Sequence, residues 1–168
     1  MQVLVTGANG FVGRNLMAHF AERSDVVVKV FTKDESESSL PSLIAHVDFI
    51  FHLAGVNRPE NPHDFISGNT DLTKSICDAV AASGRRISVI YASSIQAERN
   101  NPYGKSKKLA ENALLELGSD QEIPVHIFRL PNVFGKWARP DYNSAVATFC
   151  HNIARGLPIQ GNDPQAPI

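Results

Sequence analysis

The amino-terminal residues place an apolar strand, a glycine-rich turn and the start of a helix in direct succession. Residues 3–6 (VLVT) are predicted to form a buried strand, the turn follows at residues 7–13 (GANGFVG), and a helical pattern continues from there. In such a turn Gly7 permits a tight bend, Gly10 lets the backbone approach a bound group closely, and Gly13 lets the helix pack on the sheet. This order predicts the first unit of a parallel α/β fold.

The open end of this first helix is predicted to bind an anion. The first N–H groups of a helix have no intrahelical partner and attract negative charge, so a pyrophosphate can bind there. A glycine turn between a strand and a helix therefore indicates dinucleotide binding. The predicted cofactor residues in this segment are Gly7, Asn9, Gly10, Phe11, Val12, Gly13 and Arg14.

The rest of the chain alternates between strand and helix patterns. Strands are expected at residues 3–6, 26–31, 47–53, 87–92 and 125–130, with a sixth short extended piece at 158–160. Helices are expected at residues 11–22, 41–46, 64–84, 102–118 and 144–155, and an irregular loop at 131–143. This alternation predicts a Rossmann-like, doubly wound α/β fold with a parallel sheet, and residues 1–168 are enough for one such domain.

Tyr103 and Lys107 lie four residues apart in a helix predicted to begin after Asn101. Residues at this spacing share one helix face, so a phenol and an ammonium address the same small volume. A free tyrosine has a pKa of about 10, and a nearby cation lowers it, which makes the phenol a usable general acid or base. Ser94 follows the strand at residues 87–92 and is expected to contact the same substrate oxygen. Ser94, Tyr103 and Lys107 are therefore the predicted catalytic residues of a hydride-transfer enzyme.

An isolated Tyr-x-x-x-Lys pair is more often a solvated helix face than a catalytic pair. The glycine turn at the start of the same chain changes this balance, because it supplies the dinucleotide site that hydride transfer requires. The two motifs together favour the catalytic interpretation.

Composition and charge argue against several classes of function. The chain is 43% hydrophobic with a net charge of -1, which gives no indication of nucleic-acid or membrane binding. We expect no signal peptide, because no basic segment precedes the first strand, and no apolar run reaches transmembrane length. The two cysteines are interpreted as core residues of helices, and the six histidines are scattered without a metal motif. A cytoplasmic protein with no metal site is expected.

Three further segments carry a family resemblance. They are His52-Leu53-Ala54-Gly55, Asn69, and residues 129–135 (RLPNVFG). Together with the two motifs above, they make the chain similar to extended short-chain dehydrogenases/reductases, in the branch that acts on nucleotide sugars. The resemblance implies that Asn132 contacts the sugar nucleotide. It also implies further cofactor contacts at Leu53, Ala54, Gly55, Tyr103, Lys107, Leu130 and Pro131.

A narrower set of strings resembles one subfamily of these enzymes. The strings are residues 52–59 (HLAGVNRP), 93–97 (SSIQA), 134–137 (FGKW) and 142–150 (YNSAVATFC). That subfamily uses NADPH to reduce C4 of a UDP-linked 4-keto-6-deoxy-2-acetamido sugar, on the route to UDP-N-acetyl-L-fucosamine for capsule and O-antigen. The resemblance implies the same substrate and cofactor. It also implies a homodimer formed through the helices at residues 64–83 and 102–117.

The chain departs from its relatives in extent. Members of the subfamily continue into more substrate domain and a C-terminal cupin domain with a metal, so residues 1–168 correspond to the dinucleotide-binding domain and the start of the substrate portion. Relatives also have a third strand, but here only about fifteen residues separate the second predicted strand from Val47, near the minimum for a crossover. We therefore expect the third strand to be missing and the substrate domain to be truncated.

The end of the second predicted strand bears on the choice of cofactor. NAD enzymes place an acidic residue there to hold the ribose hydroxyls, whereas this position is Thr32 or Lys33 here. Lys33 and Arg14 are candidates to contact a 2'-phosphate, so NADP(H) is expected, with NAD(H) as the alternative. Arg58 and Arg139 are candidate contacts for the substrate pyrophosphate on the basis of charge alone.

Three other functions use parts of the same residue set. A nucleotide-sugar 4-epimerase would share the triad and hold NAD tightly. A non-catalytic dinucleotide-binding module would need no reactive tyrosine. A 4,6-dehydratase is disfavoured, because that reaction requires an Asp-Glu pair after the active-site hydroxyl and Ile95-Gln96 stand there.

Overall fold

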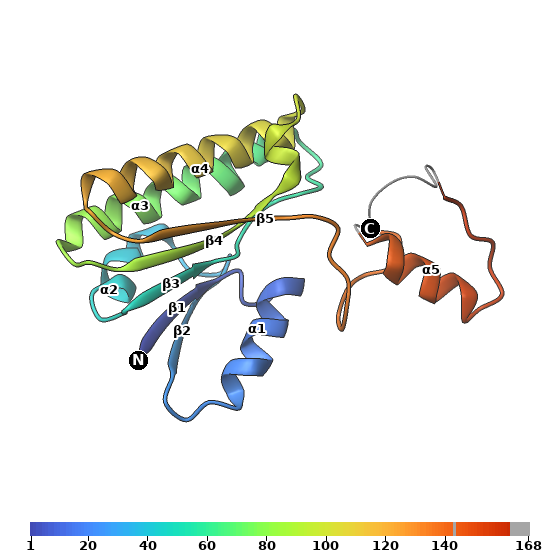
Figure 1. The fold of residues 1–168 in the computed structure, drawn as a ribbon, viewed down its shortest axis with the longest axis horizontal. Helices are drawn as coiled ribbons and strands as arrows, with labels where there is room; N and C mark the ends of the chain where they lie inside the picture. Colours follow the sequence, from blue (N-terminus) through green and yellow to red (C-terminus); the bar gives the residue numbers. More distant parts are fainter. Residues whose placement is uncertain (143, 162–168) are drawn as a thin grey trace. The chain divides into compact units, whose positions relative to one another are not determined.

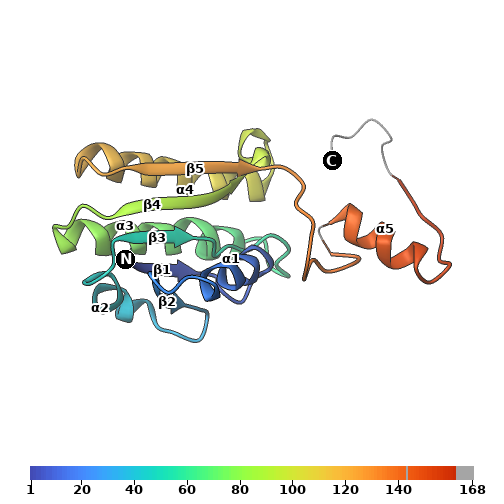
Figure 2. The same cartoon turned by 60° about the horizontal axis from the view of Figure 1, so that its bottom comes forward.

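The computed structural model describes residues 1–142 and 144–161, and five strands of this part of the chain form one sheet. Asn143, within the 142–150 string, lies outside the described residues. The strands are β1 (Gln2–Thr6), β2 (Val27–Phe31), β3 (Phe49–His52), β4 (Ser88–Ser94) and β5 (Val125–Leu130). Their spatial order is β2-β1-β3-β4-β5. The β1–β2, β1–β3 and β3–β4 pairs are parallel, and β5 runs alongside β4 in the same direction (Figure 2).

Helices cover both faces of the sheet, as the doubly wound prediction requires. Figure 1 shows α2 (Leu40–Ile44), α3 (Leu72–Ser83) and α4 (Pro102–Asp120) on one face and α1 (Phe11–Ala21) on the other. Short turns join them at η1 (Glu37–Ser39) and η3 (Ile95–Glu98), and a π-helical turn, η2 (Ile66–Asp71), leads into α3. The central strand β1 is apolar because it is buried on both faces: Val3, Leu4 and Val5 have no exposed surface. The predicted fold class is confirmed.

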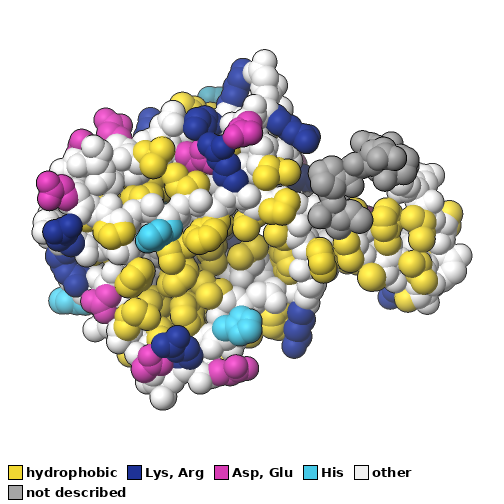
Figure 3. All heavy atoms as spheres, viewed as in Figure 1, with side chains coloured by type: hydrophobic (Ala, Val, Ile, Leu, Met, Phe, Trp, Pro, Cys, Tyr) yellow, Lys and Arg dark blue, Asp and Glu magenta, His cyan; other side chains and the backbone are white. Residues whose placement is uncertain are grey.

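Two apolar clusters fill the layers on either side of the sheet. The larger lies under α2, α3 and α4 and includes Ile50, Ile76, Tyr91 and Leu114. The smaller lies under α1 and is centred on Val3 and Val5. Over the unit that holds the sheet, Figure 3 shows apolar side chains gathered in the middle of the visible face and most charged side chains toward its margins.

The predicted loss of the third strand is confirmed. Between β2 and β3 the chain forms only η1 and α2, so β2 remains at the edge of the sheet and the chain returns past β1 to place β3. The prediction of a sixth strand is wrong, because residues 158–160 are described and are not in a strand.

The main helix of the site is longer than predicted. Asn101 caps its start by accepting a hydrogen bond from the Gly104 N–H at 2.8 Å, as expected from Asn-Pro at a helix start. The predicted end at Gly118 is wrong, because α4 continues to Asp120. A side chain at Gly118 would come within 3.1 Å of Val125 on β5, so this glycine serves close packing inside the helix.

The chain divides into two compact units, one of residues 1–129 and one that begins at Leu130. The second contains α5 (Ala145–Ile153), whose start Ser144 caps by accepting a hydrogen bond from the Ala147 N–H at 3.3 Å. Cys77 is buried as expected, but Cys150 is exposed, because α5 buries none of its residues. Within residues 1–142 and 144–161, every helix is too short or too polar to cross a lipid bilayer.

The order of the strands reverses at β1, where Gly7 meets the loop after β3. The chain leaves β1 toward β2 on one side and later places β3 on the other, so the loops after β1 and β3 meet at the carboxyl ends of the strands, where open α/β sheets bind their ligands. Gly7 has a φ of 71°, and a β-carbon on it would lie 2.6 Å from the Ala54 nitrogen. A side chain at this position would therefore force the two loops apart.

Replacing Gly7 with Ala should destabilise the fold more than the same change at Gly84. Both glycines have a positive φ, which costs other residues about 1–2 kcal/mol, but Gly84 has open space around it. The contact with Ala54 should add at least about 1 kcal/mol at Gly7, the usual scale of overpacking. Urea denaturation of both variants measures the difference. Equal losses would show that the two loops are not in close contact.

Candidate active site

The glycine turn leaves the first N–H groups of α1 available. The Gly10 N–H donates to the Gly7 carbonyl at 2.9 Å, and the Arg14 N–H donates to the Gly10 carbonyl at 2.9 Å. Gly10 is the N-cap and has no side chain to occupy the N–H groups that follow it, and a β-carbon on Gly13 would clash with the Gly7 carbonyl. This bare, close-packed turn at a helix start fits a dinucleotide pyrophosphate.

A buried histidine connects the loop after β3 to β1 and α3. The Thr73 hydroxyl donates to the Asn69 carbonyl at 2.5 Å, so it accepts from His52 Nε2 at 2.8 Å. His52 Nδ1 is then the acceptor for the Thr6 hydroxyl at 2.8 Å. Thr6 in turn accepts from the Ala54 N–H at 3.1 Å. The hydrogen bonds therefore select one neutral tautomer of His52.

Burial keeps His52 uncharged. The loss of solvent lowers the pKa of His52 to about 3, and the Lys107 ammonium contributes in the same direction. The imidazole thus serves as a fixed donor and acceptor at neutral pH, and its protonation would break the bond from Thr6.

Asn69 similarly connects the loop after β3 to α4. Its side-chain oxygen accepts from the Val56 N–H at 2.9 Å, and its side-chain nitrogen donates to the Val56 carbonyl at 2.9 Å and to the Ser106 hydroxyl at 3.0 Å. Asn69 is buried, and a β-carbon on Gly55 would lie 2.8 Å from its oxygen. The π-helical turn η2 thereby holds the loop of residues 53–56 against α4.

The structure brings the three predicted catalytic residues together at the end of β4. Ser94 is the last residue of β4, and its hydroxyl lies near enough to the Tyr103 phenol to act on it as a hydrogen-bonding group that lowers its pKa. Lys107 is buried and donates to the Tyr91 hydroxyl at 3.0 Å and to the Ala92 carbonyl at 2.8 Å. Gly55 borders the same volume, because a β-carbon on it would lie 3.4 Å from the Lys107 nitrogen.

The electrostatics of the pair differ from the expectation. Burial raises the pKa of Tyr103, and the hydrogen bond with Ser94 offsets only part of that rise. Burial lowers the pKa of Lys107 to about 8, with Glu111 acting in the opposite direction. The prediction that Lys107 lowers the pKa of Tyr103 is wrong for this structure, because burial of the phenol dominates and Ser94, not Lys107, is the group that acts against it. At neutral pH the site therefore holds a phenol beside an ammonium.

A buried carboxylate on the same helix face binds the neighbouring serine. Glu111 accepts from the Ser93 hydroxyl at 2.6 Å and from two nitrogens of Arg129 at 2.8 and 2.7 Å. Arg129 also pairs with Glu98 at 2.5 Å. Burial opposes the charged form of Glu111, but the bonds from Arg129 and Ser93 outweigh it and hold its pKa below the ordinary value. The Ser93 hydroxyl is thus committed to structure, while Ser94 faces Tyr103.

Other predicted residues lie elsewhere on the chain. Arg14, Lys33 and Arg58 are exposed residues of the first unit. Leu130 ends β5, and Pro131, Asn132 and Arg139 are exposed residues of the second unit. Their assigned contacts remain predictions.

An acidic residue near the end of β2 was missed from the sequence. Glu35 accepts from the Thr32 N–H at 2.5 Å and from the Thr32 hydroxyl at 2.7 Å. These bonds bring a carboxylate back to the strand end where NAD enzymes carry an acidic residue. It was missed because it lies three residues after Thr32 and not directly at the strand end, although Thr-x-x-Glu is a recognisable capping pattern.

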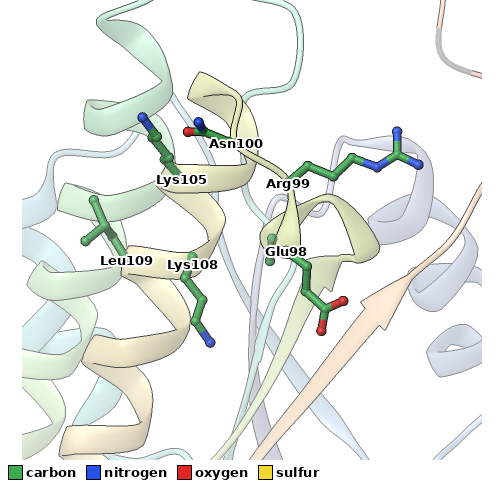
Figure 4. Close-up of a pocket in the computed structure, with 7 residues that line it drawn as sticks. Glu98, Arg99, Asn100, Lys105, Lys108 and Leu109 are labelled. Atoms are coloured by element: carbon green, nitrogen blue, oxygen red, sulfur yellow. The ribbon is translucent and has the colours of Figure 1, made fainter.

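A cavity of about 360 Å³ lies on the outer side of α4 (Figure 4). Lys105, Lys108 and Leu109 of α4 face it together with Glu98 and Arg99 of the preceding segment. None of the predicted catalytic or cofactor residues lines it. Across the described ranges, no group of three or more His, Cys, Asp or Glu side chains is placed to hold a metal ion.

Comparison with known proteins identifies the family. The model of the NAD dependent epimerase/dehydratase family matches residues 3–163. The chain belongs to this family. Among curated relatives, the UDP-2-acetamido-2,6-beta-L-arabino-hexul-4-ose reductase of Pseudomonas aeruginosa is 63% identical over all 168 residues. The chain spans 45% of that relative's length.

Solved structures agree with this membership. The capsular polysaccharide assembling protein CapF of Staphylococcus aureus has a TM-score of 0.83 and 42% identity over 99% of this chain and 45% of its own. The UDP-glucuronic acid 4-epimerase of Bacillus cereus, solved with NAD, has a TM-score of 0.81 at 20% identity, over 95% of this chain and 65% of its own. The second likeness supports the fold alone.

Replacing Glu111 with Gln should lower the melting temperature at pH 7 by at least about 5 °C. The melting temperature of this variant should also fall less steeply with pH in the acid range. Because the folded pKa of Glu111 is depressed, its contribution is present above the unfolded value of about 4.3 and is lost as the pH falls through the folded value. The gap between Glu111→Gln and the unsubstituted chain should therefore narrow in acid.

Thermal unfolding between pH 7 and pH 3 checks this expectation. Glu116→Gln, at an exposed position of α4, is the matched control and should follow the unsubstituted chain. A gap for Glu111→Gln that stays constant across this range would contradict the buried pairing with Arg129 and Ser93.

Proposed function

We propose that this chain is the dinucleotide-binding part of an NADPH-dependent reductase in capsule and O-antigen precursor synthesis. The substrate in this proposal is a UDP-linked 4-keto-6-deoxy-2-acetamido sugar of the UDP-N-acetyl-L-fucosamine pathway, reduced at C4. The observation that carries the proposal is the Ser94–Tyr103–Lys107 cluster in a chain that is 63% identical, over its whole length, to a hexul-4-ose reductase.

Each catalytic residue has a role that its surroundings support. Tyr103 keeps its proton at neutral pH, because burial raises its pKa, and would donate that proton to the developing alkoxide at C4. Ser94 lies close enough to Tyr103 to lower its pKa and would donate a hydrogen bond to the same substrate oxygen. The Lys107 ammonium would stabilise negative charge there and bind the nicotinamide ribose.

The cofactor proposal rests on the bare turn at Gly7, Gly10 and Gly13. NADPH, when bound, supplies the hydride. The N–H groups of Phe11, Val12 and Gly13 would bind its pyrophosphate. The loop of Leu53, Ala54 and Gly55 borders Gly7 and Lys107 and would contact the same cofactor. Leu130 and Pro131 are assigned to the cofactor by the family resemblance alone.

The remaining assignments extend the proposal to partners and location. Asn132, Arg58 and Arg139 are assigned to the UDP-sugar. A homodimer through α3 and α4 would cover Leu109 and Leu115, apolar residues of α4 that are 46% and 53% exposed. A cytoplasmic location agrees with Cys77 and Cys150, which are both free thiols.

Tyr103→Phe, made in the protein extended to the length of its relatives, should reduce turnover at least about a hundredfold and leave cofactor binding intact. The substitution removes the donated proton and keeps the ring beside Phe65, whose centroid lies 5.8 Å away. NADPH consumption with the UDP-linked keto sugar measures turnover, and cofactor fluorescence measures binding. Undiminished turnover in this variant would remove Tyr103 from the mechanism.

The same assay separates the reductase from its rivals. Steady NADPH consumption that depends on Tyr103 supports reduction. Epimerisation of the sugar at C4 without net consumption of NADPH, by protein that retains bound NAD through purification, would favour the 4-epimerase. Binding of cofactor with neither reaction would favour a non-catalytic module.

The preference for NADP(H) is expected to depend on Arg14 and Lys33. Replacing both Arg14 and Lys33 with Ala should raise the KM for NADPH about tenfold or more and change the KM for NADH little. Even one charge-assisted contact to the 2'-phosphate contributes about a factor of ten to affinity. Lys105→Ala, an exposed change on α4, is the control. If NADH is preferred instead and Glu35→Gln abolishes that preference, Glu35 binds the ribose and the cofactor is NAD(H).

A further inference from the structure

Tyr91 lies in the middle of β4, where an aliphatic or phenylalanine side chain would satisfy the pattern of the strand. Its side chain has no exposed surface and belongs to the main apolar core. The hydroxyl is nevertheless 3.0 Å from the Lys107 nitrogen, and that nitrogen is 4.5 Å from the centre of the Tyr91 ring. A buried tyrosine hydroxyl needs a polar partner, and here the partner is the ammonium of the catalytic cluster.

The position of this hydroxyl is set from two directions. The Tyr91 ring stacks on the His52 ring, with centroids 5.1 Å apart and planes at 26°. The Thr73 side chain is a second polar neighbour, which acts to lower the pKa of Tyr91 against the effect of burial. His52 is itself bonded at both ring nitrogens, so Tyr91 packs against a side chain that has one orientation.

Lys107 has a flexible stem, and its ammonium needs acceptors to occupy a single place. Its bonds to the Tyr91 hydroxyl and the Ala92 carbonyl use two of its three N–H donors. We propose that Tyr91 is a positioning residue for the reaction, which holds the Lys107 ammonium beside Tyr103 and Gly55 and leaves one N–H for the cofactor. The inference rests on the proposed function for its catalytic consequence, but its structural part does not.

The hydroxyl also bears on the charge of Lys107. Burial lowers the pKa of Lys107 to about 8, and an acceptor bonded to the ammonium favours the charged form. The ionisable groups that face Lys107 are Glu111 and Tyr103 of α4, Tyr91 of β4 and His52 of β3. His52 and Glu111 titrate in acid, and burial raises the pKa of both tyrosines, so Lys107 is the first of these groups to change charge as the pH rises above 7.

Tyr91→Phe tests the inference without disturbing the core, because the ring, its stacking on His52 and its contact with the cation all remain. Lysine labelled with ¹³C at Cε, in the 168-residue chain, reports the titration of Lys107 by NMR, with Lys107→Met to assign the signal. We expect the Lys107 midpoint to fall by about one pH unit, the scale of a hydrogen bond to a charged group.

Thr70→Val is the matched control. It also removes a buried hydroxyl, one that donates to the Ser106 carbonyl at 3.1 Å, but it leaves Lys107 untouched. Its Lys107 midpoint should equal that of the unsubstituted chain. An unchanged midpoint in Tyr91→Phe, or an equal shift in Thr70→Val, overturns the assignment of Tyr91.

The catalytic consequence is measured in the protein extended to the length of its relatives. The alkaline limb of kcat/KM for NADPH-dependent reduction should move to lower pH in Tyr91→Phe by the same amount as the NMR midpoint. A uniform loss at every pH would indicate a merely structural role and overturn the inference. If the NMR midpoint shifts but even the unsubstituted protein does not reduce the keto sugar, the proposed function fails while Tyr91 still positions Lys107.

Discussion

The site depends on a buried line of hydrogen bonds that runs from the loop after β3 through β1 and back to α3. Each donor in it has one acceptor, so the direction of the line and the tautomer of its histidine are determined. An unpaired buried polar group costs about 1–3 kcal/mol, so loss of one link would penalise its neighbours as well. These hydrogen bonds hold the glycine turn against the loop after β3. The members of the line are Ala54, Thr6, His52, Thr73 and Asn69.

Helix α4 carries three ionisable residues along one face, and each is accommodated differently. Tyr103 remains neutral, Lys107 is held by neutral acceptors, and Glu111 is paired with Arg129. An ion pair between Lys107 and Glu111 would neutralise the cation needed beside Tyr103. The arginine from β5 therefore has a consequence for the active site, because it satisfies the carboxylate and leaves the ammonium available.

Local patterns were sufficient to predict most of the sheet and the catalytic cluster. The turn at Gly7 and the spacing of Tyr103 and Lys107 are short-range signals whose meaning does not depend on packing. Tyr91 could not be identified from the sequence, because its hydroxyl lies in an apolar strand and meets Lys107 only when α4 packs on β4. Glu111 was recoverable, since it lies eight residues after Tyr103 on the same face. The error about the pKa of Tyr103 has the same origin, because the spacing predicts that a cation is near but not that the phenol is buried.

The opposed pKa shifts of Tyr103 and Lys107 suit one direction of reaction. Because the pKa of Tyr103 is raised and the pKa of Lys107 is lowered to about 8, the prevailing state at neutral pH is a protonated tyrosine beside a charged lysine. That state can donate a proton to an alkoxide at once, whereas alcohol oxidation would first require ionising a buried phenol. An epimerase must perform both halves of this cycle at the same site. The protonation state thus agrees better with the proposed reductase than with an epimerase, and under that proposal Lys107, whose charge is lost first in alkali, limits activity at high pH.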